Sequence, residues 1–391
     1  MNGLGFLSGS QARLFTLAAV VGAVLVALTV PLSSTHAWGN LLIASVYLTT
    51  LGLGGAMFVA FGYVTGAGWN VAFRRVPEAM AVTLVVCGVI SVGVLALGMH
   101  NYAWHAHGEA GTLWFKQMWL SPQFWLVRAV GYLALWSVLS LLIVSVSRRQ
   151  DRVGGTRLTI ANGKLSALFL AVSAVTFSLA CFDWLMALTP MWYSTVFAAY
   201  QFAGMMQATL ATMILIGLAL RAPGRPLHGV FTTEHLHDLA KLLLGFSCFW
   251  MYLWFSQFML IWYTDIPEEV AFFVPRESGA WGAVTGMNIF LNWLLPFFVL
   301  LPRPSKRSGK IAARVAGAVL LGRWLDLYWI VIPALHQAHP ESGSPLVGVA
   351  EAGSILLVLG LFTLLVSRTF GKANPVPRQD PLLEESLHYH L

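Results

Sequence analysis

The sequence predicts an all-α, polytopic membrane protein whose chain crosses the bilayer about ten times. Ten long apolar stretches fill the 391 residues, and lysines and arginines gather in every second gap between them. Hydrophobic residues make up 58% of the chain and charged residues only 10%, whereas a soluble protein is about 45–50% apolar and about 25% charged. The composition therefore excludes a soluble domain of useful size.

The individual helices follow from their length. A hydrocarbon core about 30 Å thick needs about 20 helical residues, since each adds about 1.5 Å. In order, the predicted spans are 13–31, 40–66, 78–98, 122–147, 163–188, 191–220, 238–263, 277–301, 312–336 and 346–369. Only Thr189 and Pro190 separate the fifth from the sixth, and proline suits the start of a helix. The first stretch lacks a small-residue cleavage site and is interpreted as a retained helix.

Two regions follow from these spans. We predict one transmembrane domain over residues 1–369 and a cytoplasmic C-terminal tail over 370–391. The tail holds three prolines in a polar context and cannot bury a core of its own. We therefore expect it to lie along a partner subunit.

Positive charges predict the orientation of the chain. Nineteen of the 23 lysines and arginines lie near the two termini or in alternate gaps, and only Lys116 and Arg276 lie in the opposite set. Arg128 and Arg323 lie within spans. Cytoplasmic loops of membrane proteins carry this excess of positive charge. We therefore expect both termini in the cytoplasm, and an odd number of spans would not give this alternation.

Several functions are excluded by the distribution of reactive residues. The net charge of +7 is scattered over short loops, so nucleic-acid binding is not expected. Cys87, Cys181 and Cys248 each lie in an apolar run, without a CxxCH or CxxC motif, and are expected to be small buried side chains. His100 and His336 only end spans, so they do not form a facing pair for haem b. No metal site is expected, and redox centres linked to the chain would be non-covalent or belong to partners.

Ionisable residues within the spans are the main functional signal. Each costs about 2.5–3.5 kcal/mol at mid-helix and needs a partner, an aqueous cavity or a function. Six polar residues lie in the outer halves of spans: Arg128, Asp183, Gln257, Arg323, Asp326 and Glu351. We expect them to converge on one hydrated cavity that opens to the periplasm.

The predicted roles in this cavity differ. Asp183, Asp326 and Arg323 are candidates for a proton pathway, because buried carboxylates can accept and relay protons. Arg128 and Glu351 would give electrostatic support. A quinol headgroup needs hydrogen-bond partners for two hydroxyls and a slot for its tail, and the candidate contacts are Gln257, Tyr263 and His100.

Purely structural interpretations of the same residues stay open. Arg323 and Asp326 are three apart on one helix face, so they can form a neutralised pair that only fixes helix packing. Asp183 has no positive residue within a helical turn in sequence, so its partner comes from another helix or it is protonated. Near the cytoplasmic edge, Glu78, Asp238 and Lys241 are expected to be interfacial residues that reach toward water.

A resemblance to a known family is carried by five segments. They are LGLGGAMFVAFGYVTGAGWNVAFRRVPEAM (51–80), FDWLMALTPMWYSTVFAAYQFAG (182–204), FSQFMLIWYTDIPEE (255–269), GRWLDLYWIVIPA (322–334) and DPLLEESLHYH (380–390). In these the chain resembles the NrfD/polysulfide-reductase-type membrane subunits, and most closely the ActF type found in bacterial alternative complex III, a quinol:cytochrome c oxidoreductase.

The resemblance implies two four-helix bundles with two additional helices, in a bacterial inner membrane. It implies a related NrfD-like membrane partner and further subunits that carry iron–sulfur clusters and c-type haems. It also implies oxidation of menaquinol or ubiquinol, with a proton-conducting role for the bundles. The ActC-type partner is the stronger candidate for the quinol pocket, since this chain lacks the glycine- and asparagine-rich N-terminal segment of that type.

Two other classes of function remain open from the sequence. A secondary transporter would share ten helices and buried charges, but it typically has broken helices at matching places in two halves. A scaffold subunit without chemistry would use its polar pairs only to fix packing. Co-purification of c-haem would favour the respiratory function over both.

Overall fold

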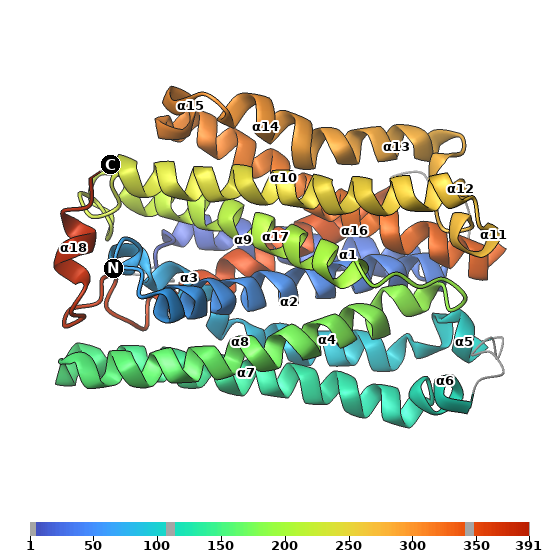
Figure 1. Ribbon diagram of the computed structural model, residues 1–391, viewed down its shortest axis with the longest axis horizontal. Helices are drawn as coiled ribbons and strands as arrows, with labels where there is room; N and C mark the ends of the chain where they lie inside the picture. Colours follow the sequence, from blue (N-terminus) through green and yellow to red (C-terminus); the bar gives the residue numbers. More distant parts are fainter. Residues whose placement is uncertain (1–4, 107–113, 341–347, 391) are drawn as a thin grey trace.

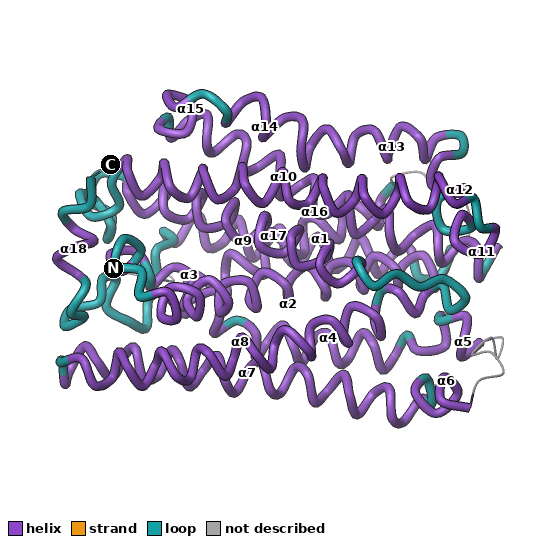
Figure 2. The backbone as a smooth tube through the Cα atoms, viewed as in Figure 1, coloured by secondary structure: helices purple, strands orange, loops and turns teal. Residues whose placement is uncertain are grey.

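Figures 1 and 2 show the computed structural model, which describes residues 5–106, 114–340 and 348–390. These residues form helices and loops and contain no strand. Ten helical segments are long and apolar enough to cross a membrane. The chain is therefore an all-α, multi-pass membrane protein, which confirms the predicted fold class.

The ten spanning segments comprise single helices and three interrupted ones. They are α1 (Gly9–Thr29), α2 (Ser34–Thr65), α3 with α4 (Arg75–Val82, Leu84–Leu97), α7 (Pro122–Val153), α8 with η3 (Thr156–Trp184, Met186–Leu188), α9 (Phe197–Arg221), α10 (Thr233–Thr264), α13 with η4 and α14 (Ala280–Ile289, Phe290–Leu294, Leu295–Leu300), α16 (Gly309–Ala338) and α17 (Val349–Phe370).

Short helices lie at the two ends of this bundle. The end where α1 begins and α17 finishes is called the terminal end here, and the opposite end is the far end (Figure 1). The terminal end carries η1 (Val71–Phe73), α15 (Arg303–Arg307) and α18 (Leu383–Leu387). The far end carries η2 (Met99–Asn101), α5 (Ala103–Ala106), α6 (Trp114–Trp119), α11 (Pro267–Val270) and α12 (Val274–Glu277).

The spanning helices pack as two groups of four and one pair. Helices α2, α3–α4, α7 and α8 contact one another and form a first bundle. Helices α9, α10, α13–α14 and α16 form a second bundle, and α1 packs along α17 as the additional pair. Helix α2 joins these groups, because it also contacts α9, α16 and α17.

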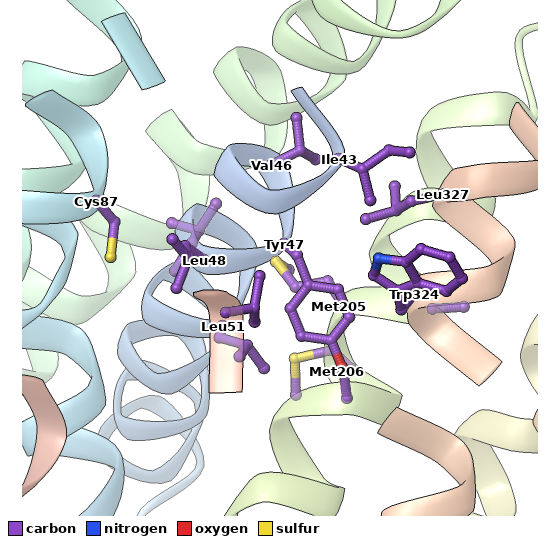
Figure 3. Packing of buried hydrophobic residues seen from close by; sticks show 14 of the residues in the cluster. Ile43, Val46, Tyr47, Leu48, Leu51, Cys87, Met205, Met206, Trp324 and Leu327 are labelled. Carbon is purple, nitrogen blue, oxygen red and sulfur yellow. The ribbon is translucent and has the colours of Figure 1, made fainter. Parts of the chain in front are cut away.

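Helix α2 lies at the centre of the molecule, and its apolar stretch is buried throughout. Figure 3 shows its side chains packed among residues of α9 and α16: Ile43, Val46, Tyr47, Leu48 and Leu51 from α2, Met205 and Met206 from α9, and Trp324 and Leu327 from α16.

Glycines of α2 allow neighbouring helices to approach it closely. A Cβ at Gly55 would lie 2.8 Å from the Pro77 carbonyl oxygen of α3, and one at Gly54 would overlap the Thr209 hydroxyl of α9. Small residues serve this purpose between membrane helices generally.

Two spans are interrupted in ways that the sequence did not predict. The third breaks at Thr83, between α3 and α4. The eighth contains a π-helix, η4, which ends two residues before Pro296 of α14. Segments of π-helix inside α-helices are rare and frequently lie at functional sites.

The C-terminal tail packs across the terminal end of its own chain. The Arg74 guanidinium donates to Asp380 at 2.5 Å, and the Ser386 hydroxyl donates to the Trp69 carbonyl at 2.7 Å. Beyond α18, the Tyr389 hydroxyl donates to Asp238 at 2.6 Å. These contacts fix the tail on its own chain, which the sequence did not predict, and its contact with a partner stays a prediction.

Candidate functional site

The second bundle holds a buried ion pair near its middle. Arg323 and Asp326 lie one turn apart on α16, and Arg323 Nη1 donates to Asp326 Oδ2 at 2.6 Å. From α9, the Tyr200 hydroxyl donates to Asp326 Oδ1, and Gln201 Oε1 accepts from Arg323 Nη2 at 2.8 Å. All four side chains are at most 3% exposed. The predicted pairing of Arg323 with Asp326 is therefore confirmed, and α9 supplies its other partners.

A row of amides continues from this ion pair along the bundle interior. Asn288 Nδ2 of α13 donates to Asp326 Oδ1 at 3.1 Å, and Asn292 Nδ2 of η4 donates to Asn288 Oδ1 at 2.7 Å. Gln207 Nε2 of α9 then donates to the Asn292 carbonyl at 2.5 Å and to Ser247 Oγ of α10 at 2.9 Å. Tyr200 and Gln207 are seven residues apart on α9, so the row extends about 10 Å along the helix axis.

The π-helix explains how two asparagines join this row. Asn288 lies in the last turn of α13, and Asn292 lies within η4. Pro296 lies four residues after Asn292 and has no N–H, so the Asn292 carbonyl lacks its α-helical donor and accepts from Gln207. The Asn292 side chain donates back to Asn288. The helix irregularity thus supplies both an acceptor and a donor to the bundle interior.

Some buried atoms of this row have no protein partner in the described part of the chain. They are Arg323 Nε, Gln201 Nε2, Gln207 Oε1 and Asn292 Oδ1. Gln201 lines a cavity of about 20 Å³ between the two bundles, together with Thr49, Cys181 and Trp184. A cavity of about 10–15 Å³ accommodates one water when polar partners are present. The other residues that line this cavity are mostly apolar, so Gln201 Nε2 gains no partner there among the described residues.

Gln257 of α10 lies on the far side of Tyr200. Both line a cavity of about 10 Å³ whose other walls are aromatic: Phe197, Trp254, Phe272, Phe273 and Trp329. This volume fits one water. Ligand pockets occupy about 300–1,000 Å³, so this cavity does not fit a quinone headgroup.

Arg276 is a site residue that the sequence reasoning missed. It belongs to α12 and is fully buried, and its Nε donates to the Trp329 carbonyl at 2.9 Å. Pro333 lies four residues after Trp329 inside α16 and has no N–H, so that carbonyl lacks its helical donor. Arg276 also donates to the Ile330 and Phe272 carbonyls, and its guanidinium stacks 3.6 Å from the centre of the Phe272 ring. Burial lowers the pKa of Arg276 to about 9, so the group is charged at neutral pH.

Asp183 lies in a separate cluster in the first bundle. Its carboxylate accepts from Arg128 Nε at 3.0 Å and Nη2 at 2.9 Å, and from Trp119 Nε1 at 2.8 Å and the Tyr132 hydroxyl at 3.2 Å. The Arg128 guanidinium also lies 3.9 Å from the centre of the Trp119 ring. The predicted partner from another helix is therefore Arg128 of α7. Each carboxylate oxygen has two donors, so the side chain is fixed in one position between α7 and α8.

Glu351 forms a third cluster, between α17 and α2. It accepts from His36 Nε2 at 2.7 Å, from Asn40 Nδ2 at 3.0 Å and from the Gly348 N–H at 2.9 Å. The last of these bonds caps the start of α17. His36 was not among the predicted site residues, because it lies at the first turn of α2 where a histidine gives no hydropathy signal.

The six polar residues therefore do not converge on one pocket. The structure divides the three acids among three clusters, each held by its own hydrogen bonds. The other two proposed quinone contacts also lie apart from Gln257: Tyr263 is 81% exposed, and His100 is exposed and contacts its neighbour Asn101. The prediction of one shared hydrated cavity is wrong, because partners from neighbouring helices neutralise each acid where it stands.

A fourth buried cluster corrects the interpretation of Glu78. Its carboxylate pairs with Arg74 at 3.3 Å and with Arg75, and Ser147 donates to it at 2.5 Å. Arg75 Nη2 in turn binds Asp151 at 2.7 Å. Glu78 is fully buried, so it does not reach toward water as predicted. The pair of Lys241 with Asp238 is closer to that expectation, since the Lys241 side chain is 46% exposed.

Comparison with known proteins gives no match to a family model and no match among curated proteins. The class of the protein accordingly rests on its fold. It is a helical multi-pass membrane protein with buried ion pairs inside two four-helix bundles.

Proposed function

We propose that this chain is the NrfD-like membrane subunit of a respiratory quinol:cytochrome c oxidoreductase of the alternative complex III type. In this proposal it lies in a bacterial inner membrane with the terminal end in the cytoplasm and the far end in the periplasm. Its partners are a related membrane subunit, an iron–sulfur subunit and c-type cytochrome subunits. The resemblance of five segments and the alternation of positive charge support this assignment.

The contribution of this chain is a proton pathway in the second bundle. The observation that carries this proposal is the buried Asp326, which contacts Arg323, Tyr200 and Asn288 at the start of a continuous row of hydrogen bonds. A buried carboxyl with a hydroxyl donor can take up and release a proton. A proton from the far end would pass by way of water beside Gln257 to the Tyr200 hydroxyl and then to Asp326.

The roles of the remaining groups follow from their contacts. Arg323 and Asn288 donate to the Asp326 carboxylate and orient it, and Asn292 donates to Asn288 in turn. Asp183 accepts four hydrogen bonds, and its role is structural: it holds α8 against α7. Oxidation of the quinol is assigned to the related membrane partner, because Gln257, Tyr263 and His100 enclose no pocket of sufficient size.

The test compares proton and electron transfer in the assembled complex. Tyr200→Phe removes the hydroxyl but leaves the Arg323–Asp326 pair, so assembly and quinol:cytochrome c turnover should be retained while protons moved per electron fall several-fold. Asp326→Asn should remove the contribution of this bundle altogether. Glu268→Gln, on the exposed short helix α11 at the far end, is the matched carboxylate control. Unchanged proton yield in both bundle variants would refute the pathway.

A secondary transporter would need a substrate site near the bilayer midplane between its halves. In the described residues, the cavity between the two bundles beside Gln201 measures about 20 Å³, which is too small for a metabolite. Purification in mild detergent separates the two functions. Co-purifying c-haem absorbance supports the respiratory assignment, and a monodisperse haem-free protein with substrate uptake in vesicles would overturn it.

A further inference from the structure

A large apolar groove separates the α1–α17 pair from α9 and α16. Its volume is about 670 Å³, and residues of α1, α2, α9, α16 and α17 line it. Ligand pockets in proteins occupy about 300–1,000 Å³ and are mostly apolar. Leu321 and Leu359 on its rim are 46% and 50% exposed, so the groove opens sideways, toward the surrounding lipid.

The groove reaches from the terminal end to the middle of the membrane. At one end it is lined by Leu7, Ala222 and Arg225, and at the other by Tyr47 and Trp324. Between Ala222 and Thr212, both of which line it, the chain advances ten residues along α9, or about 15 Å. The hydrocarbon core of a bilayer is about 30 Å thick. The groove therefore matches the depth of one leaflet.

The deep end of the groove offers no free polar group. The Tyr47 hydroxyl donates to the Leu320 carbonyl at 2.8 Å, and Trp324 Nε1 donates to Ser354 Oγ at 3.0 Å. The Thr212 hydroxyl donates to the Ala208 carbonyl at 2.8 Å. A quinone ring needs hydrogen-bond donors, and these are already engaged. The deep end therefore suits the end of a hydrocarbon chain and not a polar headgroup.

The shallow end carries a cation. Arg225 Nη1 donates to the Phe6 carbonyl at 2.5 Å, and in the described part of the chain no carboxylate pairs with this guanidinium. The side chain is half-buried and lines the groove. Guanidinium groups bind phosphate through paired hydrogen bonds. Positive charge at the mouth and an apolar wall one leaflet deep are the two halves of a phospholipid site.

We propose that this groove binds one anionic phospholipid of the leaflet at the terminal end. The phosphate lies beside Arg225, and an acyl chain extends along α9 and α16 to Tyr47 and Trp324. The lipid fills the space between the α1–α17 pair and the second bundle. This site is separate from the proposed proton pathway, because the residues that bind Asp326 do not line the groove.

The first test measures retained lipid by native mass spectrometry. The full chain is reconstituted in nanodiscs of equal phosphatidylglycerol and phosphatidylethanolamine and then extracted into detergent. One phospholipid should stay bound, with phosphatidylglycerol favoured about fivefold through the basic residue at the surface. Arg225→Gln should bring the ratio of bound phosphatidylglycerol to bound phosphatidylethanolamine to about one, while one phospholipid per protein should still be retained.

The second test fills the groove. Gly317 lines it, and a Cβ there would meet no heavy atom within 4 Å, so Gly317→Phe projects a ring into the space and should abolish retention. Gly286→Phe is the matched control, because Gly286 of α13 is equally open and lies outside the groove. Equal retention in the two variants, extraction of a quinone in place of a phospholipid, or no retained lipid would each overturn the proposal.

A fluorescence measurement on the parent protein tests the same site without the Gly317→Phe variant, so it applies even if that variant does not fold. Phosphatidylglycerol brominated at mid-chain should quench Trp324, which lines the deep end. The quenched fraction should be lower in Trp324→Phe than in the parent protein. Identical quenching in the two proteins would overturn the proposed path of the acyl chain.

Discussion

At the scale of single residues, spacing in the sequence predicted one contact of the site and left most of the others hidden. Arg323 and Asp326 are three apart on α16, and that spacing alone brings their charges together. Tyr200, Asn288 and Gln207 carry no charge, and although the two amides are polar, the sequence does not say which neighbouring helix each of these side chains faces. Their roles depend on which helices are neighbours, and that information lies in packing between distant segments.

Asp183→Asn should destabilise the protein strongly. The change leaves the buried Arg128 without its charged partner, and breaking a buried ion pair costs about 3–5 kcal/mol. Thermal unfolding in detergent should show a large loss for this variant and little change for Asp265→Asn, whose carboxylate lies in an exposed loop. A melting temperature like that of the parent would show that Asp183 does not hold α7 against α8.

The docking of the C-terminal tail should weaken in strong alkali. Burial raises the pKa of Tyr389 to about 12, and its hydrogen bond to Asp238 and the charge of that carboxylate add to the effect. The docked tail therefore holds the phenol proton more tightly than a free tail, whose phenol has a pKa of about 10. Docking is at full strength below pH 10 and is lost as the pH rises from 10 to 12.

A spin label at His390→Cys measures this transition as a gain in tail mobility. Tyr389→Phe is its control, because it keeps the ring and removes the titrating hydroxyl. Lys241 and His235 also face this part of the tail, so their contribution remains in the control. The same mobility profile in both proteins would contradict the assigned role of Tyr389.

At the scale of helices, the spans were predictable and their irregularities were not. Hydropathy and length located all ten spans, because the bilayer fixes how many apolar residues a helix needs. The break at Thr83 and the π-helix at Phe290–Leu294 leave no mark in hydropathy. One informative signal was Pro333: a proline inside a span predicts an unpaired carbonyl, and Arg276 supplies the missing donor.

Gly55→Ala should loosen the contact between α2 and α3. Its added methyl would lie 2.7 Å from Met80 Cβ and 2.8 Å from the Pro77 carbonyl oxygen, and overpacking of this kind costs about 1–3 kcal/mol. Gly93→Ala is the control in α4, where a Cβ meets nothing within 4 Å. There the better helix propensity of alanine should raise the free energy of unfolding by up to about 1 kcal/mol. Equal unfolding temperatures for the two variants would contradict this account of α2.

At the scale of the whole molecule, the arrangement of two four-helix groups and one pair agrees with what the family resemblance implied. The single outer cavity was not predictable from composition, and its prediction failed because depth in the membrane does not specify lateral position. Asp183 lies one residue before the end of α8 and Asp326 lies twelve residues before the end of α16, and the two acids belong to different bundles. Sequence position along a span gives depth, and only tertiary packing gives the neighbour.

Labelling of single cysteines tests the proposed orientation. Tyr263→Cys at the far end should react with a membrane-impermeant maleimide added to intact inner-membrane spheroplasts, whereas His388→Cys at the terminal end should react only after lysis. Both side chains are at least 80% exposed, so access of the reagent is not limited by burial. The reverse pattern would show that the excess of positive charge does not set the topology.

The burial of the apolar stretch of α2 has a consequence for biogenesis. This helix is the second to emerge during synthesis, but it is covered by α9, α16 and α17, which emerge much later. Until then its glycine-lined grooves face acyl chains or the insertion machinery. Truncated proteins that end before α16 would therefore leave the apolar stretch of α2 uncovered, and the cell's quality-control proteases should degrade them quickly.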